Sequence, residues 1–81
     1  MTLILYHTEG CHLCEEAHGL VLAALARHGI NPDLLEPVEI ADDLDLLERY
    51  GVSIPVLRES SSGRELGWPF GLEDIAGLLG L

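Results

Sequence analysis

The sequence predicts a single α/β domain built on a mixed sheet, and three observations carry this prediction. An apolar run at residues 2–7 passes through a loop with Gly10 into a long helical pattern. A second strand pattern follows, and strand, helix and strand in this order form a right-handed unit with parallel strands. Further on, two strand patterns flank residues 60–63, Ser-Ser-Ser-Gly, which have the length and composition of a hairpin loop. The 81 residues suffice for one modest core.

The first strand and the first helix are the clearest elements. Residues 3–6, Leu-Ile-Leu-Tyr, are continuously apolar, as in a central strand that is covered on both faces. The helix is expected from Leu13 to about Arg27, with the basic Arg27 in its last turn and Gly29 as a stop. Its apolar residues recur at helical spacing: Leu13, Ala17, Leu20, Val21, Ala24 and Leu25.

The second strand is expected from Leu34 to Ile40 and contains Pro37. Because proline cannot donate a hydrogen bond to a sheet, this strand should lie at the sheet edge or carry a bulge. A short helix should follow, capped by Asp42 or Asp43 and stopped by Gly51.

The C-terminal part predicts a hairpin and a closing helix. The third strand should start at Val52 and run to Arg58, and the fourth, from Arg64 to Gly67, should pair back antiparallel. Trp68 and the residues after it interrupt the strand pattern. A last helix is then expected from Leu72 to Leu79.

The charge of the chain limits its partners. The formal net charge is −10, with no lysine and only four arginines. Phosphate-rich partners should be repelled, so we expect neither nucleic acid nor an anionic membrane surface as a ligand. No leader pattern and no apolar run of about 18 residues is present, and we therefore expect a soluble, cytoplasmic protein.

Cys11 and Cys14 carry the chemical signal of the sequence. Cys11 stands where the first helix begins, and the unpaired N–H groups of a helix start favour a thiolate over a thiol. Cys14 lies one turn further on the same side, close enough to form or release a disulfide with Cys11. In a reducing compartment, a lone cysteine pair is catalytic or metal-binding rather than structural.

The order βαβ-α-ββα, with Gly10-Cys11-His12-Leu13-Cys14 opening the first helix and Ser53-Ile54-Pro55-Val56 opening the third strand, resembles the thioredoxin fold. In length the chain is similar to glutaredoxins. It most closely resembles the short glutaredoxin-like family of bacterial proteins, whose substrate is unassigned. The resemblance covers essentially the whole chain and implies a four-stranded mixed sheet with helices on both faces.

The resemblance also implies roles for individual residues. Cys11 would be the attacking thiolate and Cys14 the resolving thiol of a thiol–disulfide oxidoreductase. Pro55 would be a cis-proline facing the sulfurs, so that Ile54 offers its N–H and C=O to an extended substrate. Trp68 would border the same groove. His12 and Leu13, between the cysteines, complete the predicted substrate-binding set.

Departures from the glutaredoxin pattern argue against glutathione as the main substrate. Where glutaredoxins commonly place a basic residue before the first cysteine, this chain has His7, Thr8 and Glu9. Where they carry a Gly-Gly pair near the last helix, it has Trp68-Pro69-Phe70-Gly71. We expect weak glutathione use at best, no cofactor, a protein or peptide disulfide as substrate, and a monomer.

The carboxylates near Cys11 should moderate its acidity. The helix start lowers the pKa of the thiol, whereas Glu9, Glu15 and Glu16 raise it by like-charge repulsion. At an effective dielectric of about 20, a charge about 8 Å away is worth roughly 2 kcal/mol before screening. We therefore expect a mildly acidic thiol and not a strongly oxidising protein.

The alternative is a binding module that does not turn over, for a metal such as zinc or for a partner peptide. Two cysteines and one or two of the four histidines are zinc ligands by type. Their spacing argues against a site: His12 points about 100° round the helix from Cys11, and His28 lies near the far end. His18 lies one turn past Cys14, within reach of it, but His18 and His28 are expected to face solvent. His7 ends the first strand, where it could border the site.

Overall fold

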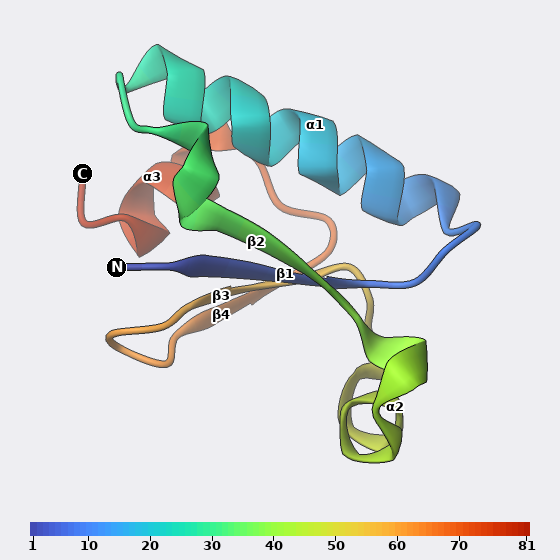
Figure 1. Ribbon diagram of the computed structural model, residues 1–81. Helices are drawn as coiled ribbons and strands as arrows, with labels where there is room; N and C mark the ends of the chain where they lie inside the picture. Colours follow the sequence, from blue (N-terminus) through green and yellow to red (C-terminus); the bar gives the residue numbers. More distant parts are fainter.

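The computed structural model describes residues 1–81. The chain forms a four-stranded sheet with three α-helices and two short 3-10 turns (Figure 1). The strands lie in the order β2-β1-β3-β4, with β1 and β2 parallel and the other pairs antiparallel. This is the predicted mixed sheet. The elements are β1 Leu3–His7, α1 His12–Arg27, a 3-10 turn Pro32–Leu34, β2 Leu35–Glu39, a 3-10 turn Ile40–Asp42, α2 Leu44–Tyr50, β3 Val56–Glu59, β4 Glu65–Gly67 and α3 Leu72–Leu78.

The central strand β1 is covered on both faces. Leu3 and Leu5 belong to the larger core, which α1 and α3 cover, whereas Tyr6 belongs to a smaller cluster with Tyr50 of α2. Figure 1 shows α1 and α3 together on one side of the sheet and α2 on the other. Because successive side chains of a strand point to opposite faces, the continuous apolar run of β1 supplies both clusters.

The larger core holds the fold together. Leu3, Leu25, Leu57 and Ile75 in it are fully buried, each at 0% exposure. Burying one such side chain contributes about 1.5–3 kcal/mol relative to leaving it in water. The remaining members of this cluster are Leu5, Ala17, Val21, Ala24, Leu35, Phe70 and Leu78.

Element ends differ from the sequence prediction by small amounts, with one larger exception. β2 is an edge strand, as Pro37 predicts, but the flanking 3-10 turns shorten it to Leu35–Glu39. Asp43 caps α2: its carboxylate accepts from the N–H groups of Asp45 and Leu46. α1 begins one residue earlier than predicted; β4 begins one residue later, and α3 ends one residue earlier.

The larger exception is the start of the third strand, which was predicted at Val52 and lies at Val56. The reason is a tight turn after α2. The N–H groups of Ser53 and Ile54 both donate to the carbonyl of Tyr50, at 2.8 and 3.1 Å, so the chain is still turning at these residues. The Ile54–Pro55 peptide bond that follows is cis.

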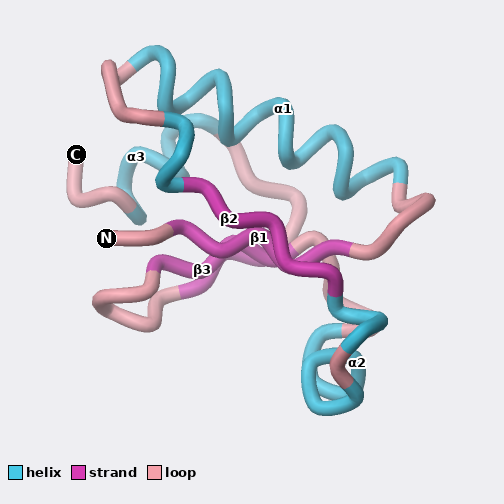
Figure 2. The backbone as a smooth tube through the Cα atoms, in the orientation of Figure 1, coloured by secondary structure: helices cyan, strands magenta, loops and turns pink.

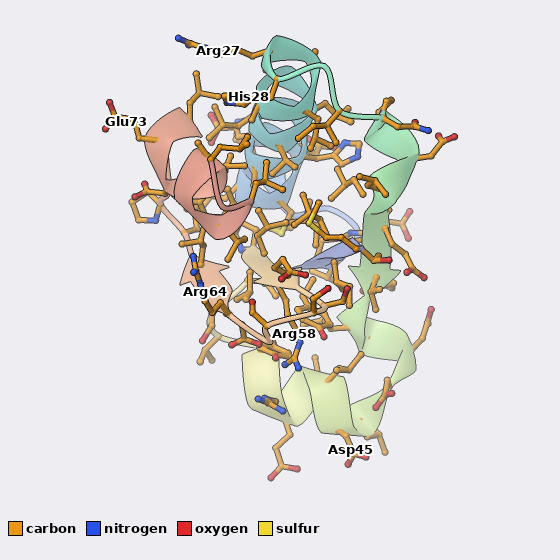
Figure 3. All side chains as sticks on the ribbon, turned by 90° about the vertical axis from the view of Figure 1, so that its left-hand side faces the viewer. Arg27, His28, Asp45, Arg58, Arg64 and Glu73 are labelled. Carbon is orange, nitrogen blue, oxygen red and sulfur yellow. A yellow bond between two sulfur atoms is a disulfide. The ribbon has the colours of Figure 1, made fainter.

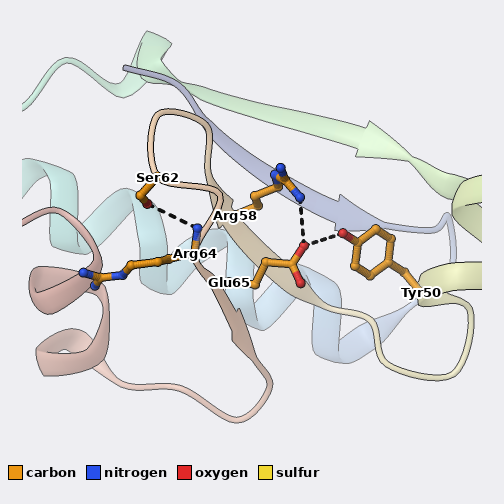
Figure 4. Close-up of polar contacts among 5 residues, drawn as sticks. All are labelled: Tyr50, Arg58, Ser62, Arg64 and Glu65. Carbon is orange, nitrogen blue, oxygen red and sulfur yellow. Dashed lines mark hydrogen bonds and ion pairs between the residues drawn. The ribbon is translucent and has the colours of Figure 1, made fainter.

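A polar contact connects α2 to the hairpin of β3 and β4 (Figure 4). The hydroxyl of Tyr50 donates to Oε2 of Glu65, and Arg58 donates to the same oxygen at 3.4 Å. On its other side, the ring of Tyr50 stacks on Tyr6 of β1, with centroids 4.3 Å apart. Burial, followed by the hydrogen bond to Glu65, raises the pKa of Tyr50.

Candidate functional site

Cys11 caps α1 and is joined to Cys14 by a disulfide. Cys11 has extended backbone angles, as N-cap residues do, and the Cys14 N–H lies 3.2 Å from its Sγ. Cys11 is partly exposed, whereas Cys14 is buried at 3% exposure. Cys11 is therefore the more accessible residue of the pair.

The loop between β1 and α1 brings Cys11 to this position (Figure 2). Gly10 has φ +80°, a left-handed conformation that glycine adopts without strain. The Cys11 N–H donates to the carbonyl of Thr8 at 3.3 Å, which closes the turn. The conformation of Gly10 and this hydrogen bond together form the turn that leads into the helix.

The carboxylate of Glu39, at the end of β2, fastens this loop to the sheet. Its Oε1 accepts from the Glu9 N–H at 2.7 Å, and its Oε2 accepts from the Ala41 N–H at 3.0 Å. The pKa of Glu39 is lowered chiefly by the hydrogen bond from Ala41, and the Thr8 hydroxyl and the Glu9 N–H add to this against the opposing effect of desolvation. An ionised carboxylate is thus part of the structure that leads to Cys11.

A pocket of about 500 Å³ opens beside the two cysteines. Its walls come from the end of β1, the following loop, the first turns of α1 and the end of β2. Both sulfur-bearing residues line it, so a group bound there lies next to the disulfide. The lining residues are Leu5, His7, Thr8, Glu9, Gly10, Cys11, Cys14, Glu15, His18, Pro37 and Glu39.

Comparison with known proteins places this geometry in a family. The family described as Glutaredoxin-like domain (DUF836) matches residues 2–80. The chain belongs to this glutaredoxin-like family. No curated protein matches the chain. The family, the thioredoxin-like fold and the Cys11–Cys14 pair together support a redox-type function.

Solved structures agree with this assignment. The X-ray structure of Northeast Structural Genomics target protein XcR50 from X. campestris is 38% identical, with a TM-score of 0.75, and the match covers 98% of this chain and 96% of that one. The solution structure of XcR50 is 40% identical, with a TM-score of 0.72 and coverage of 99% and 94%. Thioredoxin 1 from Thermosipho africanus TCF52B, 10% identical with a TM-score of 0.68 and coverage of 99% and 91%, shares the fold.

The predicted substrate-binding residues of this glutaredoxin-like chain lie outside the pocket. His12 and Leu13 are exposed on the first turn of α1, with Leu13 at 47%. Pro55 is buried, and its carbonyl accepts from the Trp68 N–H at 3.2 Å, so these two predicted residues are neighbours. The ring of Trp68 is half-buried and packs edge-on against Phe70, a member of the core.

Ile54 needs a correction. Its N–H was expected to be offered to an extended substrate, but it already donates to the Tyr50 carbonyl within the turn after α2. The turn that delays β3 thus uses this donor. The Ile54 residue is half-buried.

Sequence reasoning placed the two cysteines, Glu9 and Glu15 near one another but missed the contribution of β2 to the pocket. His18, one helical turn past Cys14, was expected to face solvent, but it is half-buried and lines the pocket with Cys14. His7 and Glu39 are paired residues of the parallel strands β1 and β2, and this register brings both to the pocket.

No group of three or more His, Cys, Asp or Glu side chains in the structure is arranged to hold a metal ion. His28 is exposed at the far end of α1, as predicted. None of the helices is long and apolar enough to cross a membrane.

Proposed function

We propose that this protein is a thiol–disulfide oxidoreductase that uses the Cys11–Cys14 dithiol on protein or peptide disulfides. The observation that carries the proposal is the arrangement of the two sulfurs. Cys11 is partly exposed at the N-terminus of a 16-residue helix, and Cys14, one turn further on, is buried and within disulfide distance. A thiolate at such a helix start is stabilised and accessible, which is what a nucleophilic cysteine requires.

The proposed reaction is a thiol–disulfide exchange in two steps. The Cys11 thiolate attacks one sulfur of the substrate disulfide, so that a mixed disulfide forms and half of the substrate leaves as a thiolate, which takes up a proton. Cys14 then loses its proton and attacks the Cys11 sulfur. The second half leaves as a thiol, and the Cys11–Cys14 disulfide forms. Two electrons pass from the protein to the substrate, and the two protons of the dithiol end on the products.

Weak or absent glutathione dependence is part of the proposal. Glutathione carries a net negative charge, and the pocket beside the sulfurs contains Glu9, Glu15 and Glu39. None of the four arginines lines this pocket. The charge distribution therefore favours other disulfides.

The substrate chain is proposed to lie across the exposed tip of the site. His12 and Leu13 follow Cys11 there and are exposed. Pro55, just before the hairpin, and Trp68, just after it, are joined by a backbone hydrogen bond. The Ile54 carbonyl is the backbone group proposed to accept a hydrogen bond from the substrate. The compartment proposed for this chemistry is the cytoplasm, where a lone cysteine pair is more often catalytic than structural.

Trapping tests the proposal. The reduced protein is mixed with an excess of a disulfide-linked peptide, and its mass is followed after acid quenching. The wild type should return to the mass of its internal disulfide. Cys14→Ser should accumulate a mixed disulfide through Cys11, and Cys11→Ser should form none. If Cys11 remains unmodified while zinc or a peptide binds stoichiometrically, the protein is a binding module and the proposal fails.

A further inference from the structure

The exchange reaction needs only the two cysteines, and it does not explain the pocket that opens beside them. Its volume of about 500 Å³ lies within the range of small-molecule sites, about 300–1,000 Å³. Cys11 and Cys14 form part of its wall. A side chain next to a substrate disulfide would therefore reach it while Cys11 attacks.

The ionisable side chains around the pocket come from every element that borders it. Glu9 lies on the loop, Glu15 on the first turn of α1, and Glu39 at the end of β2. His7 and His18 are the other titratable groups of the lining. With neutral histidines, the pocket carries three negative charges.

The three carboxylates differ in the contacts that they make within the protein. Glu39 is held by the Glu9 and Ala41 N–H groups and keeps its charge, since its pKa is lowered. Glu15 is exposed and lies 3.9 Å from the ring of His12. Glu9 is an exposed residue that lines the pocket.

The four arginines of the chain lie elsewhere. Arg27 is at the far end of α1, and Arg49 is in the last turn of α2. Arg58 and Arg64 are on the hairpin (Figure 3). Arg58 is paired with Glu65, and Arg64 donates to the carbonyl of Gly77 at the end of α3. Because the chain has no lysine and none of its arginines lines the pocket, no lysine or arginine side chain offsets the charge of the pocket carboxylates.

We propose that this pocket binds the side chain of a lysine or arginine that neighbours the cysteine of a peptide disulfide. The protein then prefers basic disulfide peptides over neutral ones, and neutral over acidic ones. The inference rests on the proposed function, because the ligand is the substrate of the same reaction. The bound cation takes no part in the bond changes; it places the disulfide against Cys11.

Three peptides test the selectivity. One short peptide is made with Arg, Gln or Glu beside its single cysteine and is oxidised to the disulfide dimer. The rate constant for oxidation of the reduced protein is measured for each dimer. Each value is divided by the rate constant with a small neutral dithiol, which removes the intrinsic reactivity of the disulfide. The Arg peptide is expected to react roughly tenfold faster than the Glu peptide at low salt, with the ratio shrinking as salt is added.

A matched pair of variants separates the pocket from the overall charge. Glu15→Gln and Glu16→Gln remove the same charge from adjacent helix positions, but only Glu15 lines the pocket. Glu15→Gln should lower the Arg-to-Glu ratio about two- to fivefold, as expected for an exposed ion pair, and Glu16→Gln should leave it nearly unchanged. Glu9→Gln, also at the pocket, should act like Glu15→Gln.

The outcomes are distinguishable. Equal normalised rates for the three peptides, or equal effects of Glu15→Gln and Glu16→Gln, would overturn the pocket assignment while the oxidoreductase function stands. If none of the peptides oxidises the Cys11–Cys14 pair, the proposed function fails, and the selectivity inference fails with it.

Discussion

The carboxylate of Glu39 accepts a hydrogen bond of 2.7 Å from the backbone N–H of Glu9, two residues before Cys11. This contact joins the end of edge strand β2 to the loop that carries the proposed nucleophile. The same carboxylate accepts from Ala41 at 3.0 Å, so one side chain fixes two segments of backbone. The position of Cys11 thus depends on a residue that is distant from it in the sequence.

Removal of the Glu39 carboxylate should loosen this loop. In Glu39→Ala, the N–H groups of Glu9 and Ala41 lose their acceptor, and their hydrogen exchange at neutral pH should become roughly tenfold faster. Glu39→Gln keeps one acceptor oxygen and should show a smaller effect. Amide exchange followed by NMR measures both. Unchanged exchange at Glu9 in the alanine variant would contradict the role assigned to Glu39.

Glu39 and Glu59 should make the protein sensitive to acid. Backbone hydrogen bonds, from Ala41 to Glu39 and from Ser61 to Glu59, lower the pKa of each carboxyl in the folded state. The unfolded chain therefore binds more protons in the acid range, and this part of the stability is lost as the pH falls below the ordinary glutamate pKa of about 4.3 and through the folded values.

Urea unfolding between pH 2 and pH 7 measures this effect. The wild type should lose stability steeply at the acid end. The double variant Glu39→Gln, Glu59→Gln should be less stable at neutral pH and should show a flatter dependence. An equally steep acid dependence in the double variant would show that other carboxylates are responsible.

Tyr50 should make the stability of the protein depend on pH in the alkaline range. Its pKa is raised in the folded state, first by burial and then by the hydrogen bond to Glu65. The folded state then keeps its proton after the unfolded chain has lost it, so stability should fall as the pH rises past about 10. Tyr50→Phe should remove this loss and cost about 0.5–1.5 kcal/mol at neutral pH. Denaturation at pH 7 and pH 10.5 checks both.

The sequence is most informative where a pattern is local. The apolar run of β1, the helical spacing of α1 and the proline of β2 each follow from neighbouring residues, and the structure confirms a covered central strand, a long helix and an edge strand. Cys11 and Cys14 are likewise a local motif. The two cysteines are three residues apart, one helical turn, and the structure joins them by a disulfide, with Cys11 partly exposed and Cys14 buried.

The pocket is harder to predict from local sequence patterns, because three separate segments of the chain form it. Nothing in the sequence around Glu39 indicates that its side chain reaches back to Glu9; this requires the parallel register of β1 and β2, in which His7 faces Glu39. The predicted start of β3 at Val52 was wrong for a similar reason. The backbone of Ser53 and Ile54 continues to bond to Tyr50, although these residues look like a strand.

Two leucines of opposite exposure test the assignment of the core. Leu57 of β3 is fully buried among α1, α3 and the sheet, whereas Leu44 of α2 is 80% exposed. Leu57→Ala should cost about 2–5 kcal/mol of stability, because it removes buried methyl groups and leaves a cavity. Leu44→Ala should change stability by less than about 0.5 kcal/mol. Similar unfolding midpoints for the two variants would contradict the proposed packing.

Gly10 and Gly19 offer a pair of substitutions with opposite expected signs. At neither position would an added Cβ meet an atom within 4 Å, so packing is the same in both cases and only the backbone differs. Gly10 has φ +80°, whereas Gly19 lies inside α1. Gly10→Ala should therefore destabilise the protein by about 1–2 kcal/mol. Gly19→Ala should stabilise it by about 0.4–1 kcal/mol, because alanine restricts the unfolded chain and favours the helix.

The same pair reports on the site. If the left-handed turn at Gly10 places Cys11 at the helix start, Gly10→Ala should also slow alkylation of reduced Cys11 by iodoacetamide, since the sulfur is displaced from the N–H groups that stabilise its thiolate. Gly19→Ala should leave the alkylation rate unchanged. Stability comes from denaturant unfolding and the alkylation rate from mass spectrometry of the reduced protein. A Gly10→Ala variant that reacts as fast as the wild type would show that the conformation of this turn does not set the reactivity of Cys11.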